Sequence, residues 1–528
     1  MIVWIVISSL LFSAKRLLRY LHYFQLEEYD SRRFFQWIFA YRAFDTRGLL
    51  VAFIALVSAF TGILPALVSF TAGIALWAIA FAEQDPRRMA KVRLTMTSRA
   101  KRIYGTAAGI ACITQIAGTW ILQESLVWLW AGEIAFFQLT PLFLLIAAIL
   151  LKKHEQRHQT LFLNEAKTIL AEVNPYIIGI TGSYGKSSTK HVLGKILQVT
   201  VGPTFWTAKS INTLMGITRE IRLNLKKGTE YALIEMGAYG AGSIQRLCQL
   251  TPPQAAIITS IGIAHLERFG SEEQVRIAKM ELAQSVPDTG ILVCNGDSPG
   301  ARQIAFENRK KTTLLYGLNE DAALDAWMTE IETKENGSYF QIHWRGNIYP
   351  GFTPLLGKTA LSNVLGAFTL ACALGGDPEY VVAVLYTLEP MKNRLEVKKE
   401  KGITYLQDAY NSNPAGFESA LHLLKALPGK RRILMTPGMI ELGEQQMAKN
   451  QELGSLAGTI CDHALIVGDR NRVPLEKGMR AGGMNSKQLL FCSTREEAFA
   501  QLRQLAQEGD LVLIENDLTD LYDAPARF

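Results

Sequence analysis

The stretch Gly179-Ile180-Thr181-Gly182-Ser183-Tyr184-Gly185-Lys186-Ser187-Ser188 decides the fold of the larger part of this 528-residue chain. An apolar, strand-like run begins at Tyr176 and leads into it, and residues 189–197 that follow resemble a helix. A strand, a glycine turn and a helix N-terminus together make an anion site, because backbone N–H groups point inward and the helix dipole is positive there. The stretch therefore predicts a phosphate-binding loop.

The loop has the pattern Thr-Gly-x-x-Gly-Lys-Ser, which is shorter than the usual eight-residue P-loop. We expect Lys186 to reach the outer phosphates of a nucleotide and the Ser187 hydroxyl to bind its Mg²⁺. The nucleotide-binding residues predicted in this loop are Gly182, Ser183, Gly185, Lys186, Ser187 and Ser188. The predicted cofactors are ATP and Mg²⁺.

Composition separates the chain into two parts. Hydrophobic residues make up 49% of the chain and the mean hydropathy is +0.11, but the first 150 residues are far more apolar than the rest. Much of the basic excess behind the net charge of +7 lies near the apolar segments, and no basic stripe is interleaved with aromatic residues. We therefore expect a membrane and no nucleic acid as partner. The six cysteines are scattered singly, which favours reduced thiols over zinc or disulfides.

Residues 1–155 are predicted to be a transmembrane region of about five spans. An uncharged run over 49–82 is interrupted at Gly62-Ile63-Leu64-Pro65, which predicts two short spans joined by a tight turn. The other predicted spans are 104–122, 126–151 and, as a marginal fifth, 2–14. Glu133 is either a polar contact within the membrane, to a lipid-linked substrate or another span, or a residue at the interface of a span that starts near Phe136. We favour the interface.

Loop charges predict the orientation. Basic residues fill the loops 15–47 and 87–102, whereas the loops around Pro65 and at 123–125 carry none. By the positive-inside rule the basic loops are cytoplasmic, and everything after Lys152 then lies inside the cell, where ATP is. We expect a multi-pass protein of the inner (cytoplasmic) membrane with its remaining domains in the cytoplasm.

The rest of the chain predicts an α/β fold in two domains, 160–390 and 391–528. Strand-like runs alternate with amphipathic helical segments, which indicates mostly parallel sheets wrapped by helices. The predicted strands are 231–235, 255–259, 290–294 and 312–316 in the first domain, and 404–407, 433–436, 464–467, 489–491 and 511–515 in the second. Alternation over 329–354 around Asn336-Gly337 predicts an antiparallel hairpin, and 361–374 predicts a helix. A hinge is expected at 390–393.

Three further residues are candidates for metal chemistry. Glu235 ends an apolar strand beside the phosphate loop, where a nucleotide-bound metal is commonly held. His265 at the next strand end is a metal ligand or, as we favour when it is considered alone, a structural histidine. Lys279, taken by itself, is a solvated helical lysine.

Together these residues resemble the Mur ligase family, whose members join an amino acid or peptide to a carboxylate with ATP. The resemblance covers residues 175–515 and is closest to the branch that adds D-alanyl-D-alanine in peptidoglycan synthesis. It rests on the phosphate loop and on Ser210-Ile211-Asn212-Thr213, Glu235-Met236-Gly237-Ala238, Ala264-His265-Leu266-Glu267-Arg268-Phe269-Gly270, Asp408-Ala409-Tyr410-Asn411-Ser412-Asn413-Pro414 and Gly438-Met439-Ile440-Glu441-Leu442-Gly443. The implied fold is a P-loop-containing central domain and a Rossmann-like C-terminal domain after the helical membrane region.

The resemblance implies roles for individual residues. The implied catalytic residues are Lys186, Lys279, Arg394 and His265, and the implied metal ligands are Ser187, Glu235, His265 and, if it is carbamylated, Lys279. Asn363 would belong to an adenine-contacting motif, Arg394 would approach the phosphates and Asp408 would lie near the ribose. The implied reaction transfers the γ-phosphate to a carboxylate and lets an amine attack the acyl phosphate.

The chain departs from the family pattern in three places. Gly357-Lys358-Thr359-Ala360-Leu361-Ser362-Asn363 lacks the usual His-Asn pair, and Ile514-Glu515-Asn516-Asp517-Leu518 replaces a Lys-Gly-Ser-Arg-type loop. Membrane spans stand where the family has its UDP-sugar-binding domain. We therefore expect a membrane-anchored amide ligase whose carboxylate substrate is lipid-linked or presented at the membrane, whose amine is an amino acid or small peptide, and which works in cell-envelope synthesis, with room for partner subunits.

Two other classes stay open. A transporter or flippase would use the spans to move a lipid-linked substrate, but few charged residues lie in them to make a polar path. A binding module that has lost catalysis would be expected to lose some of Lys186, Glu235, His265, Lys279 and Arg394, and all five are present.

Overall fold

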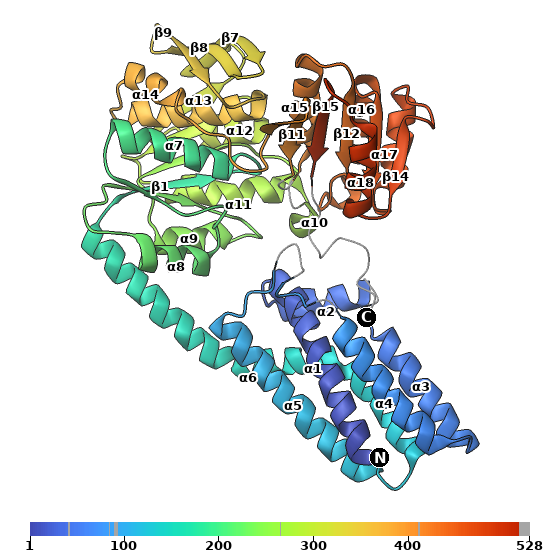
Figure 1. Cartoon of the computed structure of the whole chain (residues 1–528). Helices are drawn as coiled ribbons and strands as arrows, with labels where there is room; N and C mark the ends of the chain where they lie inside the picture. The colour runs from blue at the N-terminus through green and yellow to red at the C-terminus, as the bar shows by residue number, and fades with distance from the viewer. Residues whose placement is uncertain (41–42, 84, 89–92, 264–265, 410–411, 517–528) are drawn as a thin grey trace. The chain divides into compact units, whose positions relative to one another are not determined.

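The computed structural model describes the chain except for residues 41–42, 84, 89–92, 264–265, 410–411 and 517–528 (Figure 1). The chain divides into two compact units, Met1–Gln159 and Thr160–Asp517. His265, a predicted metal ligand, thus lies outside the described residues.

The first unit is helical. Its helices are α1 (Ile2–Leu26), α2 (Ser31–Ala40), α3 (Thr46–Thr61), α4 (Pro65–Ala82), α5 (Ser98–Leu122) and the first part of α6 (Leu126–Val173). Gly62 ends α3 with a φ of 73°, and Pro65 takes the first turn of α4, where its missing N–H costs nothing. The apolar run is therefore split into two helices at the turn that the sequence predicts.

By length and composition, three described helices can cross a membrane: α4, α5 and α6. Helix α3 has only 16 residues, about 24 Å against a hydrocarbon core of about 30 Å. Helix α1 is outside that set and carries Lys15, Arg16 and Arg19. Glu133 lies inside α6, where it is buried and accepts a hydrogen bond from Gln115 (Nε2–Oε1, 2.5 Å). The helix begins at Leu126, ahead of Glu133, and the interface position that we favoured for Glu133 stays a prediction.

A nine-stranded sheet organises the first part of the second unit. Its strands are β1 (Tyr176–Thr181), β2 (Thr204–Trp206), β3 (Tyr231–Glu235), β4 (Ala255–Ile258), β5 (Ile291–Asn295), β6 (Thr312–Gly317), β7 (Ala326–Lys334), β8 (Gly337–Trp344) and β9 (Asn347–Thr353). Their order is β2-β3-β1-β4-β5-β6-β7-β8-β9, parallel as far as β7 and antiparallel from β7 to β9. The predicted parallel strands and the hairpin after Asn336 are both present.

Helices cover both faces of this sheet (Figure 1). Helices α7 (Lys186–Thr200), α13 (Lys358–Ala373) and α14 (Pro378–Leu385) share one hydrophobic core with the sheet. Helices α8 (Leu214–Asn224), α9 (Ser243–Leu250), α11 (Glu272–Ser285) and α12 (Pro299–Glu307) share the other, and the short α10 (Leu266–Phe269) precedes α11. Burial of apolar side chains on both faces is what a parallel sheet requires.

A second sheet has six strands: β10 (Glu396–Glu400), β11 (Ile403–Asp408), β12 (Arg432–Thr436), β13 (His463–Val467), β14 (Leu489–Cys492) and β15 (Leu511–Glu515). The order is β10-β11-β15-β12-β13-β14, and only the edge strand β10 is antiparallel. Helices α15 (Pro414–Ala426), α16 (Gln446–Ile460) and α17 (Arg472–Ala481) pack on one face and α18 (Arg495–Leu505) on the other. A 3₁₀ turn, η1 (Gly443–Gln445), precedes α16.

The carboxyl ends of the parallel strands supply polar side chains. Strand β1 ends at Thr181 before the phosphate loop, β3 ends at Glu235, β11 at Asp408 and β15 at Glu515. Ligands of open α/β sheets bind at this edge of the strands. The boundary proposed at residue 390 falls between the two sheets.

Candidate active site

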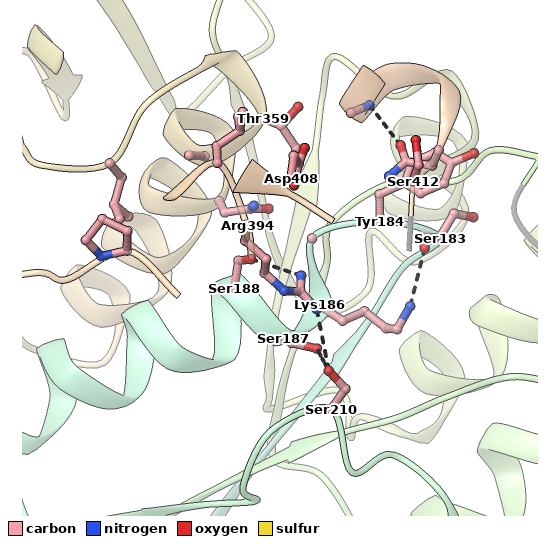
Figure 2. A pocket seen from close by; sticks show the side chains of 18 of the residues that line it. Ser183, Tyr184, Lys186, Ser187, Ser188, Ser210, Thr359, Arg394, Asp408 and Ser412 are labelled. Carbon is pink, nitrogen blue, oxygen red and sulfur yellow. Dashed lines mark hydrogen bonds between the residues drawn. The ribbon is translucent and has the colours of Figure 1, made fainter. Parts of the chain in front are cut away.

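One cavity of about 320 Å³ is lined by residues from both sheets (Figure 2). The predicted site residues that line it are Ser183, Gly185, Lys186, Ser187, Ser188, Glu235, Asn363, Arg394 and Asp408. Neither Gly182, which precedes Ser183 in the loop, nor Lys279 is among the lining residues. Residues that are 206 positions apart in the chain, Arg394 and Ser188, make a hydrogen bond here.

Close packing fixes the shape of the phosphate loop. Gly185 has a φ of 82° and is the N-terminal cap of α7, a conformation that side chains disfavour. A Cβ at Gly185 would collide with Oδ1 of Asn363 from α13. The same oxygen accepts a hydrogen bond from Thr189 Oγ1 (3.2 Å). Asn363, predicted to contact adenine, therefore contacts the loop and α7.

Cationic and hydroxyl groups gather at the start of α7. Figure 2 shows Lys186 turned back along the loop, where its Nζ donates to the carbonyl oxygens of Gly182 (2.8 Å) and Ser183 (3.4 Å). Burial lowers the pKa of Lys186. Arg394 donates from Nη1 to Ser188 Oγ (3.3 Å) and from Nη2 to Ser210 Oγ (3.5 Å). Two cations beside a helix N-terminus make an electropositive site that suits phosphate.

Glu235 is held by a buried lysine that the sequence did not single out. Lys190 Nζ lies 2.9 Å from Glu235 Oε2, and both side chains are almost fully buried. Lys190 also donates to Thr207 Oγ1 (3.1 Å) and to the carbonyl oxygen of Lys209 (2.6 Å). Lys190 follows Lys186 by one helical turn, which puts both side chains on the same face of α7. This spacing is the signal in the sequence from which Lys190 could have been predicted to lie near the site.

Hydroxyl and amide groups complete this side of the cavity. Ser187 Oγ donates to Ser210 Oγ (3.0 Å), and Asn212 Nδ2 donates to Glu235 Oε1 (3.1 Å). Ser210 and Asn212 belong to a motif of the family resemblance, although neither was predicted as a site residue.

Mg²⁺ fits the residues that meet here. Among the described residues, no group of three or more His, Cys, Asp or Glu side chains could hold a metal ion. Ser187 and Glu235 both line the cavity. Since Mg²⁺ is usually held by one or two carboxylates, substrate phosphates and several waters, this sparse set of protein oxygens suits it.

Lys279 on α11 is buried rather than solvated. Burial lowers the pKa of this lysine well below its usual range, and the charge of Lys186 lowers it further. The neutral amine is the nucleophilic form, which carbamylation requires. The predicted modification of Lys279 thus has a chemical basis, while its role as a ligand stays a prediction.

Two acids from the second sheet lie at the cavity. Asp408 and Glu515 are register partners on the neighbouring strands β11 and β15. Burial raises the pKa of Asp408 to about 6. Burial and the nearby Asp408 raise the pKa of Glu515 well above its usual range. The sequence marked Glu515 only as part of a departure from the family pattern.

Comparison with known proteins places this chain in a family. The Mur ligase middle domain matches residues 180–371, and the Mur ligase glutamate ligase domain matches residues 393–515. The UDP-N-acetylmuramoyl-tripeptide–D-alanyl-D-alanine ligase of Escherichia coli is 30% identical over 311 residues, which are 58% of this chain and 67% of that protein. The ligase of the same name from Bacillus subtilis is 28% identical over 371 residues, 68% of this chain and 79% of the relative.

Solved structures agree with these matches. MurF from Acinetobacter baumannii has a TM-score of 0.62 and 25% identity, covering 69% of this chain and 78% of that one. MurF from Thermotoga maritima in complex with ADP has a TM-score of 0.60 and 25% identity, covering 70% and 83%. The chain belongs to the Mur ligase family. Within it, the chain is a MurF-like, ATP-dependent and ADP-forming ligase of peptidoglycan synthesis.

The buried pair of Lys190 and Glu235 can be tested by removing its cation. We expect Lys190→Ala to lower the free energy of unfolding by about 3–5 kcal/mol, because Glu235 is left as an uncompensated buried charge. Lys195→Ala, on the exposed face of the same helix, should change it by less than about 0.5 kcal/mol. Urea denaturation of the full-length protein in detergent measures both. Equal midpoints for the two variants would refute the structural role of the pair.

Asp408 should make stability depend on pH. Its pKa rises from 3.8 to about 6 on folding, so the folded state prefers the protonated carboxyl and loses stability as pH rises from about 4 to above 6. Asp408→Asn removes this loss and should stabilise the protein at pH 7.5 by about 1–3 kcal/mol, with the gain vanishing near pH 4. Thermal unfolding across this range measures it, with the exposed Asp469→Asn as control. A gain that is independent of pH would contradict the burial of an ionised Asp408.

Proposed function

We propose that this chain is a membrane-anchored ligase that activates a carboxylate as an acyl phosphate and joins it to the amino group of a small peptide. The observation that carries the proposal is a cavity in which the phosphate loop, Arg394 and Glu235 meet the two acids of the second sheet. The relatives named above act with D-alanyl-D-alanine by their names, which makes this dipeptide the first candidate for the amine.

The chain's own residues account for phosphoryl transfer. The backbone N–H groups around Gly182 and Gly185 and the N-terminus of α7 cradle the phosphates. Lys186 leaves the carbonyl oxygens of Gly182 and Ser183 to pair with the outer phosphates, and Arg394 approaches them from the second sheet. Ser187 and Glu235 would hold Mg²⁺, which neutralises charge on the transferring group.

The reaction then balances in two steps. A carboxylate oxygen of the substrate attacks the γ-phosphorus, the bond to the β-phosphate oxygen breaks, and ADP leaves. The amine nitrogen next attacks the acyl carbon, the bond from carbon to the phosphate oxygen breaks, and inorganic phosphate leaves with the proton that nitrogen gives up. Water must be kept from the acyl phosphate, which is a reason to place the chemistry in a cavity rather than on an open surface.

The helical unit supports a membrane-borne acceptor. Helices α4, α5 and α6 are long and apolar enough to span a membrane, and the loops that precede α3 and α5 are basic. An acceptor that is lipid-linked or presented at the membrane would stay near the ligase. A soluble UDP-linked peptide, as in the names of the relatives, is the second candidate.

ADP release tests the ligase function directly. Detergent-purified protein is given ATP, Mg²⁺, a panel of amino acids and dipeptides that includes D-alanyl-D-alanine, and either membrane lipid extract or soluble UDP-N-acetylmuramoyl-tripeptide. We expect ADP and phosphate release that needs both an amine and the lipid fraction. Lys186→Ala should reduce it by about a hundredfold or more, since a charge that stabilises the transition state is lost, while Lys195→Ala should leave it unchanged.

The other outcomes discriminate between the hypotheses. Equal turnover with the soluble peptide would remove the membrane-borne acceptor and keep the ligase. Steady ATP hydrolysis that ignores amines would favour a transport function, and no turnover with any acceptor would favour a binding module.

Cysteine labelling tests the orientation. Of the native cysteines, only Cys112 is exposed, so Cys112→Ala gives a quiet background. In sealed cells, a membrane-impermeant maleimide should label Ile63→Cys at the turn between α3 and α4, and should label Arg88→Cys in the basic loop only after permeabilisation, as the positive-inside rule requires. The reverse pattern, or labelling of both in sealed cells, would contradict the orientation.

A further inference from the structure

Helix α2 in the helical unit is apolar on its buried face and also on part of its exposed face. On the buried face lie Phe34, Trp37 and Ile38. The ring of Phe34 lies 4.9 Å from that of Phe24, and the ring of Trp37 stacks on Tyr23 at 4.3 Å, both on α1. These contacts fix α2 at the end of the bundle where α1 ends (Figure 1).

Three phenylalanine rings form the exposed apolar part, which we call the phenylalanine patch. Phe35 and Phe39 are one helical turn apart and are 44% and 55% exposed, and Phe44, which follows the helix, is 37% exposed. The ring centroids are 4.8 Å apart between Phe35 and Phe39 and 5.4 Å apart between Phe39 and Phe44. Because adjoining apolar rings are unfavourable in water, the patch marks a surface that binds an apolar partner.

The phenylalanine patch continues onto the exposed face of α3. Helix α2 has 10 residues, a length of about 15 Å that is too short to cross a hydrocarbon core of about 30 Å. A short helix of this kind fits the bilayer interface, where amphipathic helices lie in the membrane plane. The exposed apolar side chains that follow the patch on α3 are Leu49, Leu50, Phe53, Ile54 and Val57.

Two exposed arginines flank the phenylalanine patch. Arg32 precedes Phe35 by three residues on α2, and Arg47 lies in the first turn of α3. Within the described part of the chain, neither forms an ion pair, whereas Arg33 pairs with Glu27 at 2.6 Å. Arginine side chains beside an apolar face are placed to meet the phosphates of lipid headgroups.

The turn before α2 shows that the helix is held in one position. Glu28 and Tyr29 have φ values of 57° and 60°, the left-handed region that side chains disfavour. Asp30 then caps the helix, because its Oδ1 accepts from the backbone N–H groups of Arg32 and Arg33 at 2.9 Å each. An unfavourable turn, a cap and buried aromatic contacts together keep the phenylalanine patch exposed.

We propose that α2 is an interfacial helix that binds the cytoplasmic surface of the bilayer. The phenylalanine patch would enter the outer acyl region, and Arg32 and Arg47 would bind the headgroup phosphates of anionic lipids. The proposal rests on the membrane anchoring proposed above and adds the element and the lipid class that the anchor uses. The sequence alone placed this segment within a basic cytoplasmic loop, 15–47.

The test uses the full-length protein in phosphatidylcholine vesicles that contain phosphatidylglycerol. Cys112→Ala removes the exposed native thiol, and bimane, a small apolar fluorophore, is attached at Phe39→Cys. Lipids carry a nitroxide quencher at a shallow or a deep position of the acyl chain. We expect the shallow quencher to be the more effective, since an interfacial helix lies about 5–10 Å into the boundary between headgroups and acyl chains.

Two further labelled positions are the controls. A label at Ile54→Cys on α3 should be quenched most by the deep nitroxide, and a label at Gln36→Cys, exposed on α2 but outside the patch, should be quenched less than the one at Phe39→Cys. Quenching on α3 with none at the patch would overturn the interfacial helix, keep the membrane anchor and point to a protein on the patch. Equal quenching at both α2 positions would also overturn it. No quenching on α3 would overturn the anchor and the helix together.

The lipid class is tested by the headgroup of the shallow quencher. At Phe39→Cys we expect nitroxide phosphatidylglycerol to associate more strongly than nitroxide phosphatidylcholine, by about fivefold for each arginine, and less so at high salt. Arg32→Gln combined with Arg47→Gln should abolish this preference, whereas Lys195→Gln, an exposed cation on α7, should not change it. Equal quenching by the two headgroups, or a preference that survives the double substitution, would overturn the role of the arginines.

Discussion

The close approach of α13 to the phosphate loop is the constraint on which the rest of the site depends. Gly185 can hold its left-handed conformation against Asn363 only because it has no Cβ, which would collide with Oδ1 of Asn363. Thr189 then ties α7 to the same asparagine. Since α7 and α13 share one hydrophobic core with the sheet, the shape of this loop is set by core packing.

That fixed loop decides where the remaining charges can lie. Lys186 and Lys190 leave the same face of α7 one turn apart, so one can serve the phosphates while the other compensates Glu235. Arg394, which directly precedes the second sheet, donates hydrogen bonds to Ser188 and Ser210 beside the loop. The electropositive site therefore needs residues from both parts of this unit.

Local signals in the sequence predicted most of the fold and the glycine-loop residues that line the cavity. The glycine loop, the apolar strands and the Asn336-Gly337 turn can each be recognised from a short stretch of sequence, and the structure contains each of them. Strands β2 and β10 were missed because one has three residues and the other, Glu396–Glu400, is a charged edge strand without an apolar face. Lys190 and Glu515 were missed because burial of a charged side chain depends on packing between distant segments. A lysine in a helix is expected to be solvated until the segments that pack against it are known, as Lys190 and Lys279 both illustrate.

In the helical unit, too, a buried charged side chain is paired with side chains from distant segments. Arg16 on α1 is fully buried and pairs with Asp45 (Nε–Oδ2, 2.6 Å) and with Glu83, which ends α4. Asp45 also caps α3 through the N–H of Gly48 (2.7 Å). Sequence patterning counted Arg16 among the loop charges that set orientation, yet here it joins three helices. Buried ion pairs add little net stability, but an unpaired partner is strongly unfavourable, so such a network tolerates few arrangements of the helices. We infer that this unit is a specifically packed bundle rather than a loose set of helices.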